Sequence, residues 1–118
     1  MTVARFLAAF VAAEHLGFFV LEAFLWTTPL GLKVFRQTPE AAEASRVLAA
    51  NQGLYNAFLA AGLLWGLLSP AAGVPVLTFF LVCASVAGLF GAATASPSIF
   101  FVQALPAFLA LAVLRWAA

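Results

Sequence analysis

Two glutamates and the chain's one histidine lie within a single apolar stretch near the start of the sequence. This stretch, EHLGFFVLEAFLW, runs from Glu14 to Trp26 and includes His15 and Glu22. Carboxyl and imidazole groups can act as general acids and bases or carry a proton. Because ionisable groups are costly in hydrocarbon, they nearly always face a protein interior or a cavity. We therefore take His15, Glu22 and Glu14 as candidate catalytic residues of a site inside a membrane.

A second polar stretch, NQGLYN, runs from Asn51 to Asn56 at the head of another apolar run. At about 100° per residue, its four polar side chains share an arc of roughly 140°. The same arithmetic gathers the polar side chains of Glu14–Trp26 within roughly 120°. If these faces meet, they line a polar pocket in the half of the protein nearest residues 27–46. The expected ligand-binding residues are Glu14, His15, Glu22, Trp26, Asn51, Gln52, Tyr55, Asn56, Thr94 and Gln103.

The composition indicates that these residues belong to a membrane protein. Of the 118 residues, 66% are hydrophobic and only 8% are charged. A soluble domain of this size needs a polar surface that so few charges cannot supply. The net charge of +1 and the lack of a Lys/Arg cluster argue against a nucleic-acid partner. Membrane lipids are the expected surroundings.

Four apolar runs predict membrane-spanning helices over about 3–26, 39–68, 74–95 and 98–116. Each is near the roughly 20 residues that a span requires. The predicted fold is all-α: a polytopic membrane protein with one domain over residues 1–118, a four-transmembrane-helix bundle with an extended second helix. Thr38-Pro39-Glu40 is typical of a helix start, with threonine as the N-cap. The half away from residues 27–46 is rich in Leu, Phe and Ala, which predicts plain packing there.

The distribution of basic residues predicts an orientation. Three lie in the 27–46 segment and two on the opposite side, namely Lys33, Arg36 and Arg46 against Arg5 and Arg115. Because cytoplasmic loops carry an excess of Lys and Arg, this favours the 27–46 loop in the cytoplasm. The expected location is the cell inner membrane, with several passes.

Several kinds of site are excluded by residue counts. A di-iron bundle and a haem with two axial histidines each need more than one histidine. Cys83 is the only cysteine, which excludes an internal disulfide and a zinc site built on paired thiolates. No metal and no cofactor are predicted.

Three functions remain open. The first is binding of a small amphipathic or lipid-like ligand, such as a quinone, an isoprenoid or a lipid, in the polar pocket. The second is a membrane-embedded enzyme that uses acid/base chemistry, for example isomerisation, on such a substrate. The third is a small proton-coupled transporter, which would require a homodimer because four short helices enclose little volume.

Three motifs resemble a known family. They are HLGFFVLEAFLW from His15 to Trp26, NQGLYNAFLAAGLLW from Asn51 to Trp65, and the pair Gln103 and Pro106. Together they are similar to the small bacterial membrane proteins of domain of unknown function 1304, and the resemblance covers nearly the whole chain. It implies four transmembrane helices and no particular activity.

Overall fold

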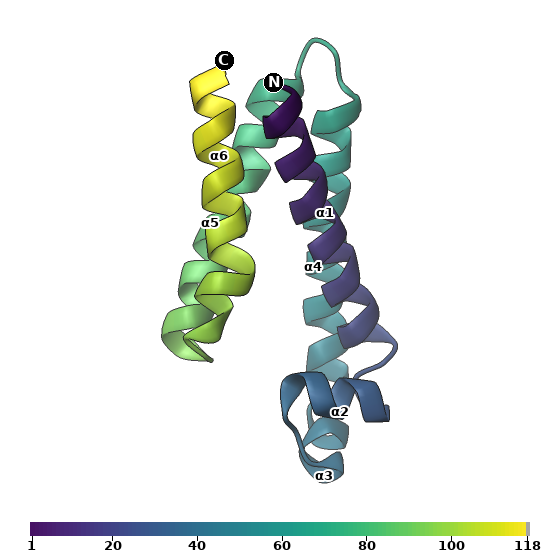
Figure 1. Ribbon diagram of the computed structural model, residues 1–118. Helices are drawn as coiled ribbons and strands as arrows, with labels where there is room; N and C mark the ends of the chain where they lie inside the picture. The colour runs from purple at the N-terminus through teal and green to yellow at the C-terminus, as the bar shows by residue number, and fades with distance from the viewer. Residues whose placement is uncertain (118) are drawn as a thin grey trace. The chain divides into compact units, whose positions relative to one another are not determined.

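A computed structural model describes residues 1–117 as a series of helices joined by short turns (Figure 1). The elements are α1 (Thr2–Ala23), α2 (Pro29–Phe35), α3 (Pro39–Ala44), α4 (Arg46–Leu68), α5 (Gly73–Thr94), the π-helical turn η1 (Phe100–Ala104) and α6 (Leu105–Ala117). In this described part of the chain, four segments are long and apolar enough to cross a membrane: α1, α4, α5 and η1 with α6. The predicted all-α fold with four candidate spans is confirmed.

The described residues form two compact units. Unit 1 comprises Met1–Glu14 with the described part of Leu59–Ala118, and unit 2 comprises His15–Phe58. Helices α1 and α4 contribute to both units. Helices α5 and α6 with η1 belong to unit 1, whereas α2 and α3 belong to unit 2. The candidate site residues are therefore divided between the two units.

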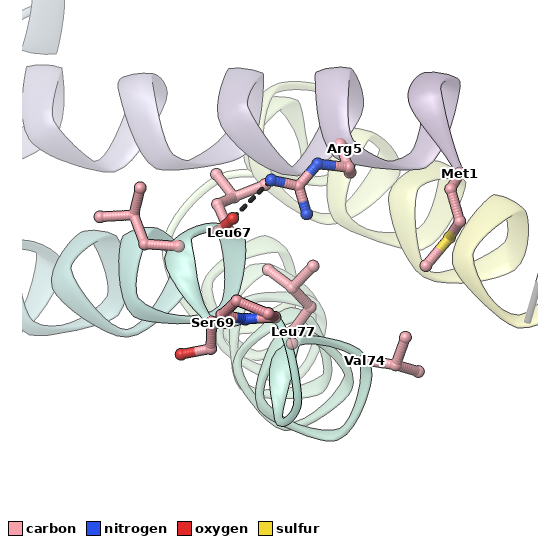
Figure 2. Close-up of a pocket in the computed structure, with 9 residues that line it drawn as sticks. Met1, Arg5, Leu67, Ser69, Val74 and Leu77 are labelled. Atoms are coloured by element: carbon pink, nitrogen blue, oxygen red, sulfur yellow. Dashed lines mark hydrogen bonds between the residues drawn. The ribbon is translucent and has the colours of Figure 1, made fainter.

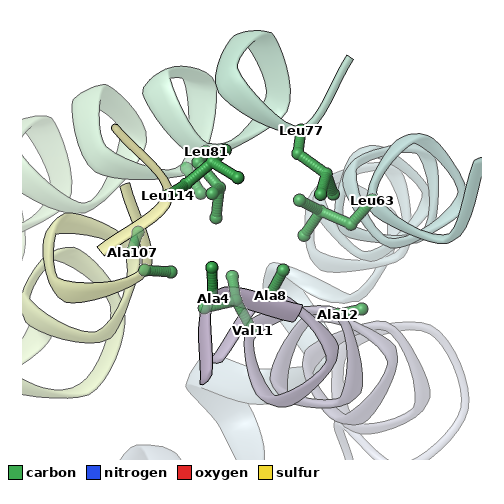
Figure 3. Packing of buried hydrophobic residues seen from close by; sticks show 11 residues of the cluster. Ala4, Ala8, Val11, Ala12, Leu63, Leu77, Leu81, Ala107 and Leu114 are labelled. Carbon is green, nitrogen blue, oxygen red and sulfur yellow. The ribbon is translucent and has the colours of Figure 1, made fainter. Parts of the chain in front are cut away.

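The core of unit 1 packs small residues of α1 against leucines and alanines of its other helices (Figure 3). Ala4, Ala8 and Ala12 recur every four residues and so lie on one face of α1. The rest of the buried cluster is Val11, Leu63, Leu77, Leu81, Ala84, Ala107, Ala110 and Leu114. Lipid provides no hydrophobic driving force between helices, so close packing of small side chains must stabilise this core.

The last span begins with a turn of π-helix that a proline explains. Pro106 has no N–H, and its ring would meet the carbonyl of Val102 in a regular α-helix. In η1 the N–H of Leu105 instead bonds the carbonyl of Phe100, five residues earlier. Beside this turn, α5 comes so close that a Cβ on Gly88 would lie 2.6 Å from the Ala104 nitrogen. The disturbance of the helix before Pro106 therefore takes the form of η1.

A short helix follows α1 in the 27–46 segment, which is predicted from the sequence as a loop. Helix α1 ends at Ala23, and the side chain of Thr28 caps α2 by accepting a hydrogen bond from the Gly31 N–H. Proline occupies the first position of α2, as is common at helix starts. Thr28-Pro29 is therefore the same signal as Thr38-Pro39 and could have predicted α2.

The helix predicted over 39–68 contains one break. Thr38 caps its start as predicted, and its side chain accepts a hydrogen bond from the Ala41 N–H. At Ser45 the backbone leaves helical geometry, with φ −105° and ψ 8°, so that α3 and α4 are separate helices. The Ser45 hydroxyl donates to the Ala41 carbonyl at 2.8 Å, and such bonds from serine to the preceding turn bend helices.

Candidate functional site

One hydrogen bond joins the two polar stretches singled out in the sequence. Asn56 Nδ2 of α4 donates to Glu22 Oε1 of α1 at 2.5 Å, within unit 2, and both side chains are half-buried. Gly53 lies one turn before Asn56 and permits this approach. A Cβ on Gly53 would lie 3.1 Å from the Phe19 carbonyl oxygen and 3.2 Å from the Ala23 nitrogen. The face of α4 that carries Gly53 and Asn56 therefore packs against α1.

The remaining polar residues of NQGLYN lie on the surface of the described chain. Asn51 and Gln52 are exposed, and Tyr55 is 63% exposed with its ring edge against Phe58. At 1.5 Å per residue, Asn51–Asn56 lie roughly 7 to 15 Å along α4 from its first residue. This depth is inside the candidate span. Hydrocarbon around a span would offer these amide and phenol groups no hydrogen-bond partner.

Trp26 is held by residues of the segment after α1. Its Nε1 donates to Ser45 Oγ at 3.1 Å, and its ring packs on Phe35 with centroids 4.6 Å apart. Nearby in sequence, the side-chain oxygen of Gln37 is buried and has no hydrogen-bond partner among the described residues. The sequence predicts neither Ser45 nor Gln37 as a site residue, and Ser45 lies 19 positions after Trp26, which leaves no local signal for their contact.

Glu14 is half-buried, and the neighbouring His15 is more deeply buried. His15 is fully buried, and its ring meets Phe18 edge-on with centroids 5.4 Å apart. Glu14 belongs to unit 1, and its Oε1 is buried without a hydrogen-bond partner in the described part of the chain. An ionisable group inside a span is a functional candidate by default, and a carboxyl oxygen that lacks a partner strengthens that reading.

The two predicted site residues of the later helices lie in unit 1. Thr94 is exposed at the end of α5, and its hydroxyl donates to the Phe90 carbonyl of its own helix at 2.7 Å. Gln103 is half-buried within η1. The structure thus brings together Glu22 and Asn56, and it leaves Thr94 bonded within its own helix.

The chemistry available at the Glu22–Asn56 pair is hydrogen bonding. A carboxylate has two acceptor oxygens, and a primary amide has two N–H donors and one acceptor. One carboxyl oxygen and one amide nitrogen are used in the mutual bond, which leaves further groups for a ligand. Across residues 1–117 no three His, Cys, Asp or Glu side chains gather as a metal site would require.

These features define an all-α membrane protein with four candidate spans and a polar cluster at the head of the second. A family model described as "Protein of unknown function (DUF1304)" matches residues 9–115, and the chain belongs to this family. The chain is also similar to the "Uncharacterized protein YpaA" of Lactococcus lactis subsp. lactis (strain IL1403). The two are 30% identical over 107 residues, which cover 89% of this chain and 90% of the relative. No solved structure gives a significant match.

Proposed function

We propose that the protein binds a small amphipathic or lipid-like ligand at the face of unit 2 formed by Glu22, Asn56, Tyr55 and Gln52, here called the polar face. The observation that carries this proposal is that Tyr55 and Gln52 are exposed at the depth of the candidate span, next to the half-buried and hydrogen-bonded pair of Glu22 and Asn56. A polar group left in hydrocarbon without a hydrogen bond costs about 2 kcal/mol or more. A ligand head that bonds these groups would remove that cost, and its tail would lie along neighbouring apolar side chains.

The ligand classes that fit are a quinone, an isoprenoid or a lipid. Each has a small polar head that can accept from the Asn56 amide or the Tyr55 hydroxyl, or donate to Glu22, together with a long apolar part. Phe58 packs beside Tyr55 and is 56% exposed, so it offers an apolar surface directly next to the polar groups.

The proposed setting is the cell inner membrane, with the 27–46 segment in the cytoplasm. Support comes from the basic residues of that segment, which outnumber those on the opposite side. With this orientation the polar face would lie in the cytoplasmic half of the membrane, a few turns below the surface.

Native mass spectrometry of gently extracted protein tests the proposal. We expect a small molecule to remain bound to the wild type, and its retention to fall about tenfold in Glu22→Gln and several-fold in Tyr55→Phe. The physical reason is that a hydrogen bond to a charged group contributes about 1.5–3 kcal/mol and a neutral one about 1 kcal/mol. Glu40→Gln makes the same chemical change at an exposed residue of α3 and should retain the ligand fully.

Two outcomes would contradict ligand binding. One is that no small molecule remains with any variant. The other is a spectrum dominated by two chains that separate in Tyr55→Phe, because a second copy would then cover the polar face.

The unpartnered buried oxygen of Glu14 favours proton-coupled transport as a second candidate function. If it operates, proteoliposomes containing the protein should take up protons in response to a pH gradient, and Glu14→Gln should reduce the rate at least tenfold. Glu22→Gln and Glu40→Gln serve as controls for the loss of a carboxyl elsewhere. Uptake equal to that of empty liposomes would remove this candidate and leave binding alone.

A further inference from the structure

A hollow of about 360 Å³ lies in unit 1, where α4 turns into α5 beside the start of α1 (Figure 2). Its polar lining comes from Arg5 and Ser69, and its apolar walls include Leu67, Leu68, Val74 and Leu77. The residues of this end, rich in Leu, Phe and Ala, predict plain packing here. The hollow is separate from the polar face, whose residues all belong to unit 2.

Arg5 is oriented at the hollow by the end of α4. Its Nη2 donates to the carbonyl of Leu67 at 2.5 Å (Figure 2). The last carbonyls of a helix have no partner within the helix, and a cation there is favourable. A guanidinium group has five N–H donors, so this single bond leaves several available. Arg5 is exposed and can present them to a ligand.

The charge at this end of unit 1 is positive. No acidic residue lines the hollow. Glu14, the acidic residue of unit 1, is nine positions from Arg5, roughly 13 Å along α1. Helix α5 begins at Gly73 in the lining, and no side chain caps its first N–H groups. The positive end of the helix dipole at this start adds to the attraction for an anion.

Two exposed tryptophans indicate that the hollow lies at the level of the lipid headgroups. Trp65 is 58% exposed and lies one turn before the end of α4, and Trp116 is 91% exposed at the end of α6. Exposed tryptophans of membrane proteins concentrate at the interface between headgroups and hydrocarbon. An anion held by Arg5 would therefore lie among the headgroups, with apolar leucine and valine walls directly beside it.

We propose that this hollow binds the phosphate of an anionic glycerophospholipid. Arg5 pairs with the phosphate oxygens, a geometry to which a planar guanidinium is well matched. Ser69 can donate a further hydrogen bond, and the acyl chains follow Leu68 and Val74. The shape and charge of the hollow favour a lipid over free phosphate, because the apolar walls contribute nothing to a small inorganic anion.

The test is titration of the full chain with phosphatidylglycerol, with bound lipid counted by native mass spectrometry. We expect Arg5→Gln to weaken binding about tenfold and Arg5→Lys to weaken it less. Arg115→Gln removes the same charge outside the lining and should bind like the wild type. Val74→Trp adds a large side chain to the lining of the hollow and keeps Arg5. We expect this variant to lose the lipid as well. Such a loss would show that lipid binding needs the hollow and not only the hydrogen bond between Arg5 and Leu67.

Three results would overturn the proposal. Equal weakening in Arg5→Gln and Arg115→Gln would mean that only the overall charge attracts the lipid. Unchanged binding in Val74→Trp would mean that the hollow is not the site. Inorganic phosphate that displaces the lipid at equal concentration would mean that the site takes free phosphate.

Discussion

Replacing Gly31 by alanine is expected to destabilise the protein by about 3 kcal/mol, the upper end of the usual effect of overpacking. A Cβ at this position would lie 2.0 Å from the carbonyl oxygen of Leu25 and 2.7 Å from that of Trp26. Both obstacles are backbone atoms, so no change of rotamer relieves the clash. The Leu25 carbonyl is also held by the Thr28 hydroxyl at 2.6 Å. Helix α2 would have to move, and the packing of Phe35 on Trp26 would be lost with it.

The free energy of unfolding in mixed detergent micelles, measured by titration with a denaturing detergent, checks this expectation. Gly17→Ala is the matched control, because a Cβ at Gly17 has nothing within 4 Å. Alanine is favoured over glycine within a helix by about 1 kcal/mol, so the control should be as stable as the wild type or more so. If Gly31→Ala unfolds at the same denaturant concentration as Gly17→Ala, the close contact between Gly31 of α2 and the Leu25 carbonyl oxygen is contradicted.

Replacing Gly53 by leucine is expected to separate α1 from α4 within unit 2 and to destabilise the protein by about 2–3 kcal/mol. The first added carbon would already lie 3.1 Å from the Phe19 carbonyl oxygen and 3.2 Å from the Glu22 Cβ. Three further carbons cannot fit against this backbone. Because Asn56 lies one turn after Gly53, the displacement should also break its hydrogen bond to Glu22. This variant therefore tests the geometry of the polar face as well as its stability.

Three measurements define the result for Gly53. The unfolding free energy should fall little in Gly53→Ala and strongly in Gly53→Leu, because one carbon needs only a small shift of its neighbours. Gly17→Leu makes the same change in open space and should stay within about 1 kcal/mol of the wild type. Any ligand lost in Glu22→Gln should be lost in Gly53→Leu too. Wild-type stability in Gly53→Leu would show that α1 and α4 do not cross at this glycine.

Local sequence patterns predict the helices well, because a span is a property of a continuous run of residues. The four apolar runs suffice to predict the four candidate spans, and Thr38-Pro39 suffices to predict the start of α3. The same kind of signal at Thr28-Pro29 marks α2. No local signal predicts the break at Ser45. The Ser45 hydroxyl donates to the Ala41 carbonyl and accepts from Trp26 Nε1, and the second of these partners lies far away in the sequence.

The candidate site is only partly predictable, because helical periodicity gives the angle of a residue on its own helix and not the neighbour that it faces. The polar arc of NQGLYN spans roughly 140°. Asn56 at one edge of this arc and the adjoining Gly53 meet α1, where the absent side chain of glycine allows a close approach. Tyr55 and Gln52 are on the exposed part of the same arc.

By itself, the sequence indicated a membrane protein with four candidate spans and with ionisable and amide groups in two of them. Composition and run length are enough for that conclusion, because the preference for water or hydrocarbon is a property of each side chain by itself. Tertiary structure alone decided that Glu22 pairs with Asn56, that Trp26 binds Ser45, and that a hollow opens beside Arg5. Each of these depends on how closely two helices approach. That distance is determined by glycines and turns whose partners lie far away in the chain.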